Sequence, residues 1–135
     1  MAGKLWLVGT PIGNLGDVSQ RTREILSSAD VIACEDTRRT RTLLTHLGVP
    51  APRLVSYFDS NEKERVPMIL RELESGREVA LVTDAGMPAL SDPGFRLVAA
   101  CVAAGVDIDS VPGPTALVQA LVLSGLPTDR FVFEG

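Results

Sequence analysis

Short apolar runs alternate along the chain with longer segments in which apolar residues recur every three or four positions. The short runs are typical of β-strands, and they occupy residues 5–8, 31–34, 53–56, 79–82, 108–111 and 131–133. The run at 79–82 is the clearest, with Val, Ala, Leu and Val in succession. A wholly apolar run of this kind indicates a strand that is covered on both faces of its sheet.

The segments between these runs have the period of amphipathic helices. Their apolar faces fall within residues 18–29, 37–47, 66–73, 95–102 and 117–124. The first helix is predicted to begin near Ser19, and Thr37 is the predicted cap of the second, which should end at Gly48 in the left-handed conformation. Pro67 lies inside the third pattern and predicts a kink or a later start.

Strands that alternate with helices in this way predict βαβ units joined by right-handed crossovers. We therefore expect an α/β fold of three αβα layers, with a mostly parallel sheet of about five strands. The chain has 135 residues, 45% of them hydrophobic, which suits one domain with a substantial core. Its last residues, DRFVFEG, begin a further apolar run. We expect residues 1–135 to be the N-terminal domain of a two-domain protein whose C-terminal domain lies outside this sequence.

Charge and composition narrow the possible functions. The formal net charge of −4 argues against binding to nucleic acid through overall charge, although a local basic patch is compatible with it. His46 is the only histidine, is expected on the surface near a helix end, and leaves no set of histidines for a metal. Cys34 and Cys101 lie in apolar contexts and are interpreted as buried thiols. Without a signal peptide or a long apolar span, a cytoplasmic location with no membrane contact is expected.

The unusual residues gather in the segments that follow the predicted strands. These segments are 9–17, 35–41, 56–65, 83–94 and 112–116. In a parallel sheet they meet at one edge, where open α/β sheets bind their ligands. The first segment, GTPIGNLGD, has neither the G-x-G-x-x-G spacing nor a Walker A ending, which disfavours a dehydrogenase or a P-loop NTPase.

Two of these segments are predicted to lead into helices. Asp92 is the predicted N-cap before Pro93, and Gly113 is the predicted N-cap before Pro114. Both helix amino ends would then offer N–H groups to an acceptor at the same edge. Capping accounts for Asp92 but leaves Asp84 and its neighbours in TDAGMPALSDPG unexplained.

The segment EDTRRTR places Glu35 and Asp36 at a strand end and Arg38, Arg39 and Arg41 on the next helix. Two interpretations are open at this point. The charges pair with one another in solvent, or the arginines form a local patch that contacts phosphate.

The segments GTPIGNLGD, EDTR, TDAGMPALSDPG and PGPTA, in this order, resemble the tetrapyrrole methylase superfamily of S-adenosylmethionine-dependent enzymes. The resemblance covers essentially the whole chain. The porphyrin and corrin branch usually has a shorter G-x-G-x-G-D first loop and a Gly-Asp-Pro motif after the fourth strand. This chain has the longer Pro-Ile-Gly-Asn loop and Asp84-Ala85-Gly86, which is similar to the branch that modifies ribosomal RNA.

The resemblance implies methyl transfer from S-adenosylmethionine to a cytidine 2′-hydroxyl of 16S rRNA in the 30S subunit, by a homodimer. The residues that it implies for cofactor binding are Pro11, Gly13, Asp84, Ala85, Gly86, Met87, Ser91, Pro112, Gly113, Pro114 and Thr115. The alternatives are a porphyrin or corrin methyltransferase, or, for this fragment by itself, an inactive folding or dimerisation module. No metal is expected.

A ribose hydroxyl is a poor nucleophile, so its methylation is expected to need a base. Glu35 and Asp36 are the candidates for that base. Arg38, Arg39 and Arg41 are the candidates for RNA contact, and the first two could orient a phosphate of the substrate.

Overall fold

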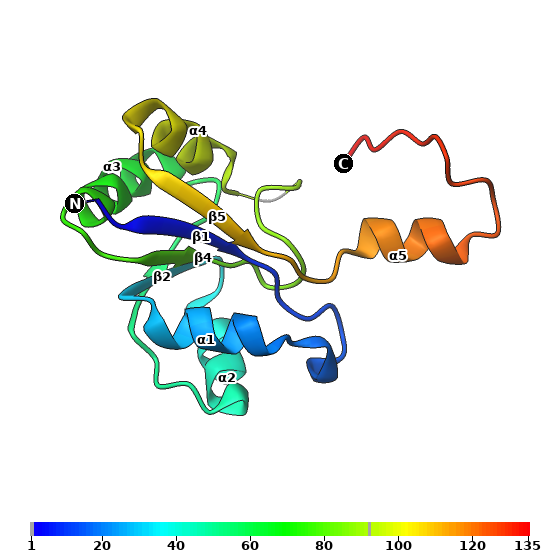
Figure 1. The fold of residues 1–135 in the computed structure, drawn as a ribbon, viewed down its shortest axis with the longest axis horizontal. Coiled ribbons are helices and arrows are strands. Elements are labelled where there is room, and N and C mark those ends of the chain that lie inside the picture. The colour runs from blue at the N-terminus through cyan, green and yellow to red at the C-terminus, as the bar shows by residue number, and fades with distance from the viewer. Residues whose placement is uncertain (1, 92) are drawn as a thin grey trace.

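The computed structural model describes residues 2–91 and 93–135 and contains one parallel sheet with helices on both of its faces (Figure 1). In chain order its elements are β1 (Lys4–Val8), the 3-10 helix η1 (Leu15–Asp17), α1 (Gln20–Ser28), β2 (Val31–Cys34), α2 (Thr37–Leu47), β3 (Arg53–Ser56), α3 (Glu62–Glu74), β4 (Val79–Leu81), α4 (Phe95–Ala104), β5 (Asp107–Val111) and α5 (Ala116–Leu123).

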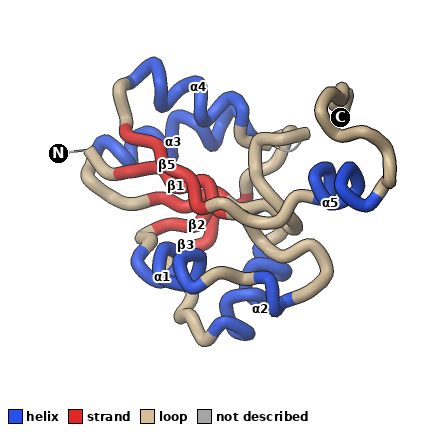
Figure 2. The backbone as a smooth tube through the Cα atoms, turned by 45° about the vertical axis from the view of Figure 1, so that its right-hand side comes forward, coloured by secondary structure: helices blue, strands red, loops and turns tan. Residues whose placement is uncertain are grey.

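The five strands form a sheet in the order β3-β2-β4-β1-β5, and every pair of neighbours is parallel (Figure 2). The register is continuous across the centre, where Leu5 of β1 lies opposite Val79 of β4 and Ile108 of β5. The predicted parallel sheet of about five strands is therefore confirmed. All five strands end at the same edge, and the loops that follow them meet there.

The two faces of the sheet are covered by different helices, as Figures 1 and 2 show. Val31 and Ala33 of β2 share a core cluster with buried residues of α3 and α4, whereas Ile32 and Cys34 pack with buried residues of α1 and α2. Successive side chains of a strand point to opposite faces, so a strand covered on both sides must be apolar at every position. This confirms the three-layer αβα architecture.

The helix boundaries follow local capping, with two corrections among the first three helices. Ser19 caps α1 by accepting the Thr22 N–H at 3.0 Å, as predicted. The cap of α2 is Asp36 rather than Thr37, because the Asp36 carboxylate accepts N–H bonds from the first turn. Gly48 ends α2 with φ 70°, as predicted. The expected later start of α3 at Pro67 is wrong, since α3 already begins at Glu62.

The starts of α4 and α5 also differ from the predictions. Gly94 is the N-cap of α4, so Pro93 lies before the cap, and the predicted cap Asp92 lies outside the described residues. Thr115 caps α5 in place of Gly113, because its hydroxyl accepts the Val118 N–H at 3.1 Å and glycine has no side chain to do so.

The segment that follows β5, which includes α5, is not part of the layers that cover the sheet. Helix α5 stands apart from the other layers in Figure 1, and none of its residues is buried. Its predicted apolar face is therefore not part of the core. Residues 131–133 were predicted to be a strand, but they are irregular in the structure and pair with none of the described strands. A strand needs a neighbour for its backbone hydrogen bonds, and this segment has none in the described chain.

Candidate functional site

Backbone hydrogen bonds hold together the loops after β1, β4 and β5. Thr10 and Gly86 exchange two bonds in an isolated antiparallel bridge, with N–H to O distances of 3.0 and 3.1 Å. The Gly9 N–H donates to the Val111 carbonyl at 3.1 Å, and the buried Thr10 hydroxyl lies 3.4 Å from the Thr83 carbonyl. These three loops therefore form one connected surface at the ends of the three strands.

Glycine is required where two of these loops cross. A Cβ atom added at Gly9 would lie 2.5 Å from the Cα of Gly113, and one added at Gly113 would lie 2.6 Å from the Cα of Gly9. Gly86 has φ 83°, a left-handed conformation in which other residues are strained. The glycines of the predicted cofactor loops thus allow the loops to approach one another.

The loop after β2 is fastened to the loop after β4 by two acidic residues. The Asp36 N–H donates to Asp84 Oδ1 at 3.3 Å, and the Asp36 carboxylate in turn accepts the N–H groups of Arg38 and Arg39 at 2.9 and 3.4 Å. Glu35 is half-buried directly before this turn. One of the two candidate bases, Asp36, therefore also has a structural role as the cap of α2.

Helix α2 carries three exposed arginines, Arg38, Arg39 and Arg41. None of the salt bridges found among the described residues involves them. Contact of these arginines with phosphate stays a prediction.

A buried hydrogen bond from a tyrosine supports the far end of the β4 loop. Tyr57 donates to the Glu62 carboxylate at 2.6 Å, and the same oxygen accepts the Gly94 N–H at 3.3 Å. Burial, reinforced by the neighbouring carboxylate, raises the pKa of Tyr57 well above its usual range. Between these supports the loop is strained, because Ala89 and Ser91 have positive φ values of 68° and 54°.

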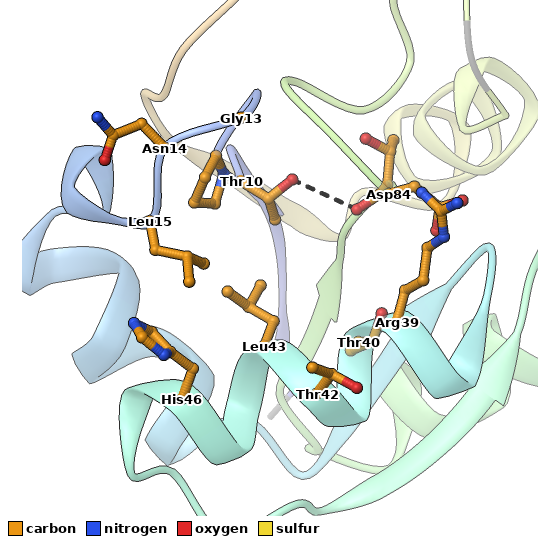
Figure 3. Close-up of a pocket in the computed structure, with 12 residues that line it drawn as sticks. Thr10, Gly13, Asn14, Leu15, Arg39, Thr40, Thr42, Leu43, His46 and Asp84 are labelled. Carbon is orange, nitrogen blue, oxygen red and sulfur yellow. Dashed lines mark hydrogen bonds between the residues drawn. The ribbon is translucent and has the colours of Figure 1, made fainter.

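A pocket of about 350 Å³ lies where the end of β4 meets the first loop and α2 (Figure 3). The loops after β1 and β2 lead to helices on one face of the sheet, whereas the loop after β4 leads to the opposite face. Such divergence creates the crevice in which open α/β sheets hold ligands. The lining residues are Thr10, Pro11, Gly13, Asn14, Leu15, Arg39, Thr40, Thr42, Leu43, His46, Thr83 and Asp84.

The structure distributes the predicted cofactor residues over three neighbouring pockets. Pro11, Gly13 and Asp84 line the pocket beside α2. Pro112, Gly113 and Pro114 line a second pocket of about 510 Å³. Ala85, Gly86, Met87 and Thr115 line a third pocket of about 440 Å³, which is bounded by Leu90, Leu117 and Phe133. Ser91 is exposed on the β4 loop.

His46 and Leu43 were not among the predicted site residues, yet both line the pocket beside α2. Leu43 lies four positions and His46 seven positions after Arg39 along the helix, and this spacing was the available signal. Residues at that spacing share one helix face. The sequence alone does not reveal that this face meets the first loop.

The two cysteines lie on opposite sides of the sheet: Cys34 of β2 packs with buried residues of α1 and α2, and Cys101 of α4 packs with buried residues of α3 and of the strands. Burial raises the pKa of both thiols, and that of Cys101 reaches about 11. This confirms that they are buried thiols. In the described part of the chain, no helix is long and apolar enough to cross a membrane, and no three His, Cys, Asp or Glu residues are grouped as metal ligands would be.

Comparison with known protein families shows to which family the chain belongs. The family model for tetrapyrrole (corrin/porphyrin) methylases matches residues 4–133. The chain belongs to the tetrapyrrole methylase family. Family membership accords with the four loop motifs, which all lie at the carboxyl edge of the sheet.

Curated relatives named ribosomal RNA small subunit methyltransferase I align with nearly the whole chain. The Synechocystis protein is 53% identical over 98% of this chain and 47% of its own length. The corresponding proteins of Escherichia coli O157:H7 and Thermotoga maritima are 48% and 49% identical over 98% of this chain, and 46% and 60% of their own lengths are covered. The chain thus spans about half the length of these relatives.

Two solved structures share the fold. The native form of uroporphyrin III C-methyl transferase from Thermus thermophilus matches with a TM-score of 0.66 and 23% identity, over 93% of this chain and 53% of the other. A second structure of the Thermus thermophilus enzyme gives a TM-score of 0.65 at 27% identity, over 94% and 55% of the two chains. These matches confirm the predicted fold class.

Proposed function

We propose that this chain forms part of an enzyme that transfers the methyl group of S-adenosylmethionine to a cytidine 2′-hydroxyl of 16S rRNA in the small ribosomal subunit. The observation that carries the proposal is the alignment of 98% of the chain, at about half identity, with relatives that bear the name of a small-subunit rRNA methyltransferase. The proposed enzyme is a cytoplasmic homodimer. Because the chain covers about half of those relatives, its own contribution is proposed to be one wall of the cofactor site.

The third pocket has the chemistry that a sulfonium cofactor needs. Among the described residues that line it, none carries a charge, and Met87 and Leu90 give it apolar surface. A site that lacks strong anions does not overstabilise the sulfonium before its charge is lost in the transition state. Gly86 and Thr115 keep backbone close to the pocket, where N–H and C=O groups can orient a bound nucleoside.

The remaining cofactor candidates would complete the site around this pocket. Pro112, Gly113 and Pro114 would hold the cofactor from the β5 side, and Pro11, Gly13 and Asp84 from the β1 side. Ser91 would lie at the outer end of the β4 loop. When bound, S-adenosylmethionine supplies an electrophilic methyl group, and catalysis then depends mainly on holding the ribose oxygen in line with it.

We propose that Glu35 or Asp36 assists the loss of the proton from the ribose hydroxyl, while the arginines of α2 bind phosphates of the RNA. Substitution of each acid by its amide separates the two candidates. Asn is as good an N-cap as Asp, so Asp36→Asn keeps the start of α2 while removing the carboxylate. The base is the residue whose amide variant lowers the single-turnover rate of the two-domain enzyme. If neither variant lowers it, the proposed base is rejected.

The proposal is tested by incubating the two-domain enzyme with labelled S-adenosylmethionine and either 30S subunits or a tetrapyrrole. Label in 16S rRNA at a ribose whose 3′ phosphodiester bond resists alkaline hydrolysis supports the proposal, because a methylated 2′-oxygen cannot attack that bond. Label only in the tetrapyrrole would favour the porphyrin or corrin alternative. If calorimetric titration shows that the 135-residue chain binds S-adenosylmethionine far more weakly than the longer enzyme, the chain by itself acts as a folding or dimerisation module.

A further inference from the structure

The pocket beside α2 has a basic residue at each end and apolar side chains between them (Figure 3). Arg39 and His46 lie on one face of α2, seven residues and therefore about 10 Å apart along the helix axis. Leu43 lies between them on the same face, and Leu15 of η1 points toward it from the opposite wall. The two leucines give the middle of the pocket an apolar surface on which a flat ring can pack.

Helix α2 concentrates positive charge in an otherwise acidic chain. Its sequence, TRRTRTLLTHL, has three arginines, one histidine and no acid, whereas the whole chain has a net charge of −4. Arg39 and His46 are exposed, and no salt bridge found among the described residues engages either of them. The Arg39 guanidinium can therefore bind an anion, and its planar fork suits a phosphate.

The inner end of the pocket has hydrogen-bond acceptors. Asp84 lines it and is half-buried, and its Oδ1 already accepts the Asp36 N–H. A carboxylate repels phosphate, but it accepts hydrogen bonds from amino and hydroxyl groups, including the amino group of cytosine. Anionic groups are thus favoured at the basic ends, and donors are favoured beside Asp84.

We propose that the side of this pocket lined by Leu15, Arg39, Leu43 and His46, next to the residues proposed to hold the cofactor, binds one nucleotide of the single-stranded RNA substrate, in addition to the nucleotide that is methylated. Its base packs between Leu15 and Leu43, and the phosphates on its two sides contact Arg39 and His46. An internal nucleotide of an RNA strand carries a phosphate on each side, which matches a pocket with a side chain that can donate hydrogen bonds to phosphate at each end. Single-stranded RNA is commonly recognised through unstacked bases packed on side chains. The pocket volume of about 350 Å³ suits a small ligand. This inference rests on the proposed function.

The test uses cytidine 3′,5′-bisphosphate as the probe and the 135-residue chain as the protein, because all the residues involved lie within it. His46 is the only histidine, so the ring protons of a single imidazole report directly on the pocket in a ¹H NMR titration. The bisphosphate is expected to shift these signals saturably and to bind at least tenfold more tightly than cytidine or inorganic phosphate. Inorganic phosphate that binds as tightly as the bisphosphate would overturn the proposal, because it would show simple attraction of anions.

Matched variants test the geometry. Arg39→Ala and Leu15→Ser should each weaken binding of the bisphosphate at least fivefold, and Leu15 is 46% exposed, so its replacement should not unfold the chain. Arg71→Ala removes an equivalent charge from exposed α3 surface and should leave binding unchanged. Equal losses for Arg38→Ala and Arg39→Ala would contradict the pocket, because Arg38 does not line it.

The outcome is separable from that of the proposed function. If the chain binds the nucleotide but the two-domain enzyme does not methylate 30S subunits, the proposed function is rejected and the pocket is still supported as a nucleotide-binding site. Methylation of 30S subunits without nucleotide binding by the chain would overturn this inference alone.

Discussion

The crossing of Gly9 and Gly113 gives the sharpest prediction. In Gly113→Ala the new Cβ would lie 2.6 Å from Gly9 Cα and 2.9 Å from the Gly9 carbonyl carbon, and both neighbours are backbone atoms. Ordinary carbon contacts are about 3.5–4.0 Å, so the two loops must separate by roughly 1 Å. Overpacking of this size costs about 1–3 kcal/mol of unfolding free energy. The same displacement breaks the 3.1 Å hydrogen bond from Gly9 to Val111.

Two measurements on the 135-residue chain check this prediction. Urea denaturation should show the loss of about 1–3 kcal/mol. Hydrogen exchange should show faster exchange of the Gly9, Thr10 and Gly86 amides, whose bonds join the loops. The control is Gly105→Ala, a helix C-cap with φ 69° and no atom within 4 Å of an added Cβ. It should cost about 1–2 kcal/mol through backbone strain alone and leave these three amides protected.

Wild-type protection at all three amides in Gly113→Ala would show that the two loops accept the new methyl group without separating, contrary to this prediction. In the two-domain enzyme the same variant should weaken S-adenosylmethionine binding more than tenfold, because Gly113 is a proposed part of the cofactor wall and a misplacement of about 1 Å is costly. Wild-type affinity in that variant would show that the crossing supports stability but not the cofactor site.

Three further predictions concern the supports of the site and the core. Tyr57→Phe removes the hydrogen-bond donor to the buried Glu62 carboxylate and should lower the unfolding free energy by about 2 kcal/mol in urea denaturation. A loss below about 0.5 kcal/mol would contradict a strong buried hydrogen bond. Ala89→Gly relieves the backbone strain at the positive φ of 68° and should raise the unfolding free energy by about 0.5 kcal/mol. The gain is expected because the relief of strain exceeds the entropy cost of glycine. A net loss of unfolding free energy would show that packing of the Ala89 methyl group matters more. Because burial raises the pKa of Cys101 from 9.0 to about 11, its contribution to stability is complete below pH 9 and is lost as the pH rises to 11. Urea denaturation at successive pH values should therefore show a smaller alkaline loss in Cys101→Ala than in the wild type, and identical losses would contradict the shift.

Much of the fold was predictable because its signals are local. The strands β2 (Val31–Cys34) and β4 (Val79–Leu81) are apolar at every position, as strands covered on both faces require. Ser19 and Gly48 mark helix ends through chemistry within a few residues of themselves. The errors in the helix caps arose where neighbouring residues could each act as the cap. Asp36 caps α2 in place of Thr37, and Thr115 caps α5 in place of Gly113, because their side chains accept N–H bonds from the first turn. Residue spacing alone does not show which neighbour makes such a bond.

The sequence by itself determined the family, the layer architecture and the edge of the sheet at which the unusual loops gather. These features depend on hydrophobic periodicity and on motifs that are contiguous in the chain. Only the tertiary structure decided which loops touch, because the Thr10–Gly86 bridge and the Gly9–Gly113 crossing join residues far apart in sequence. It also brought Leu15 opposite the face of α2 that carries Arg39 and His46. A pocket is formed by the spatial meeting of segments, and neither the composition nor the periodicity of one segment specifies the other wall.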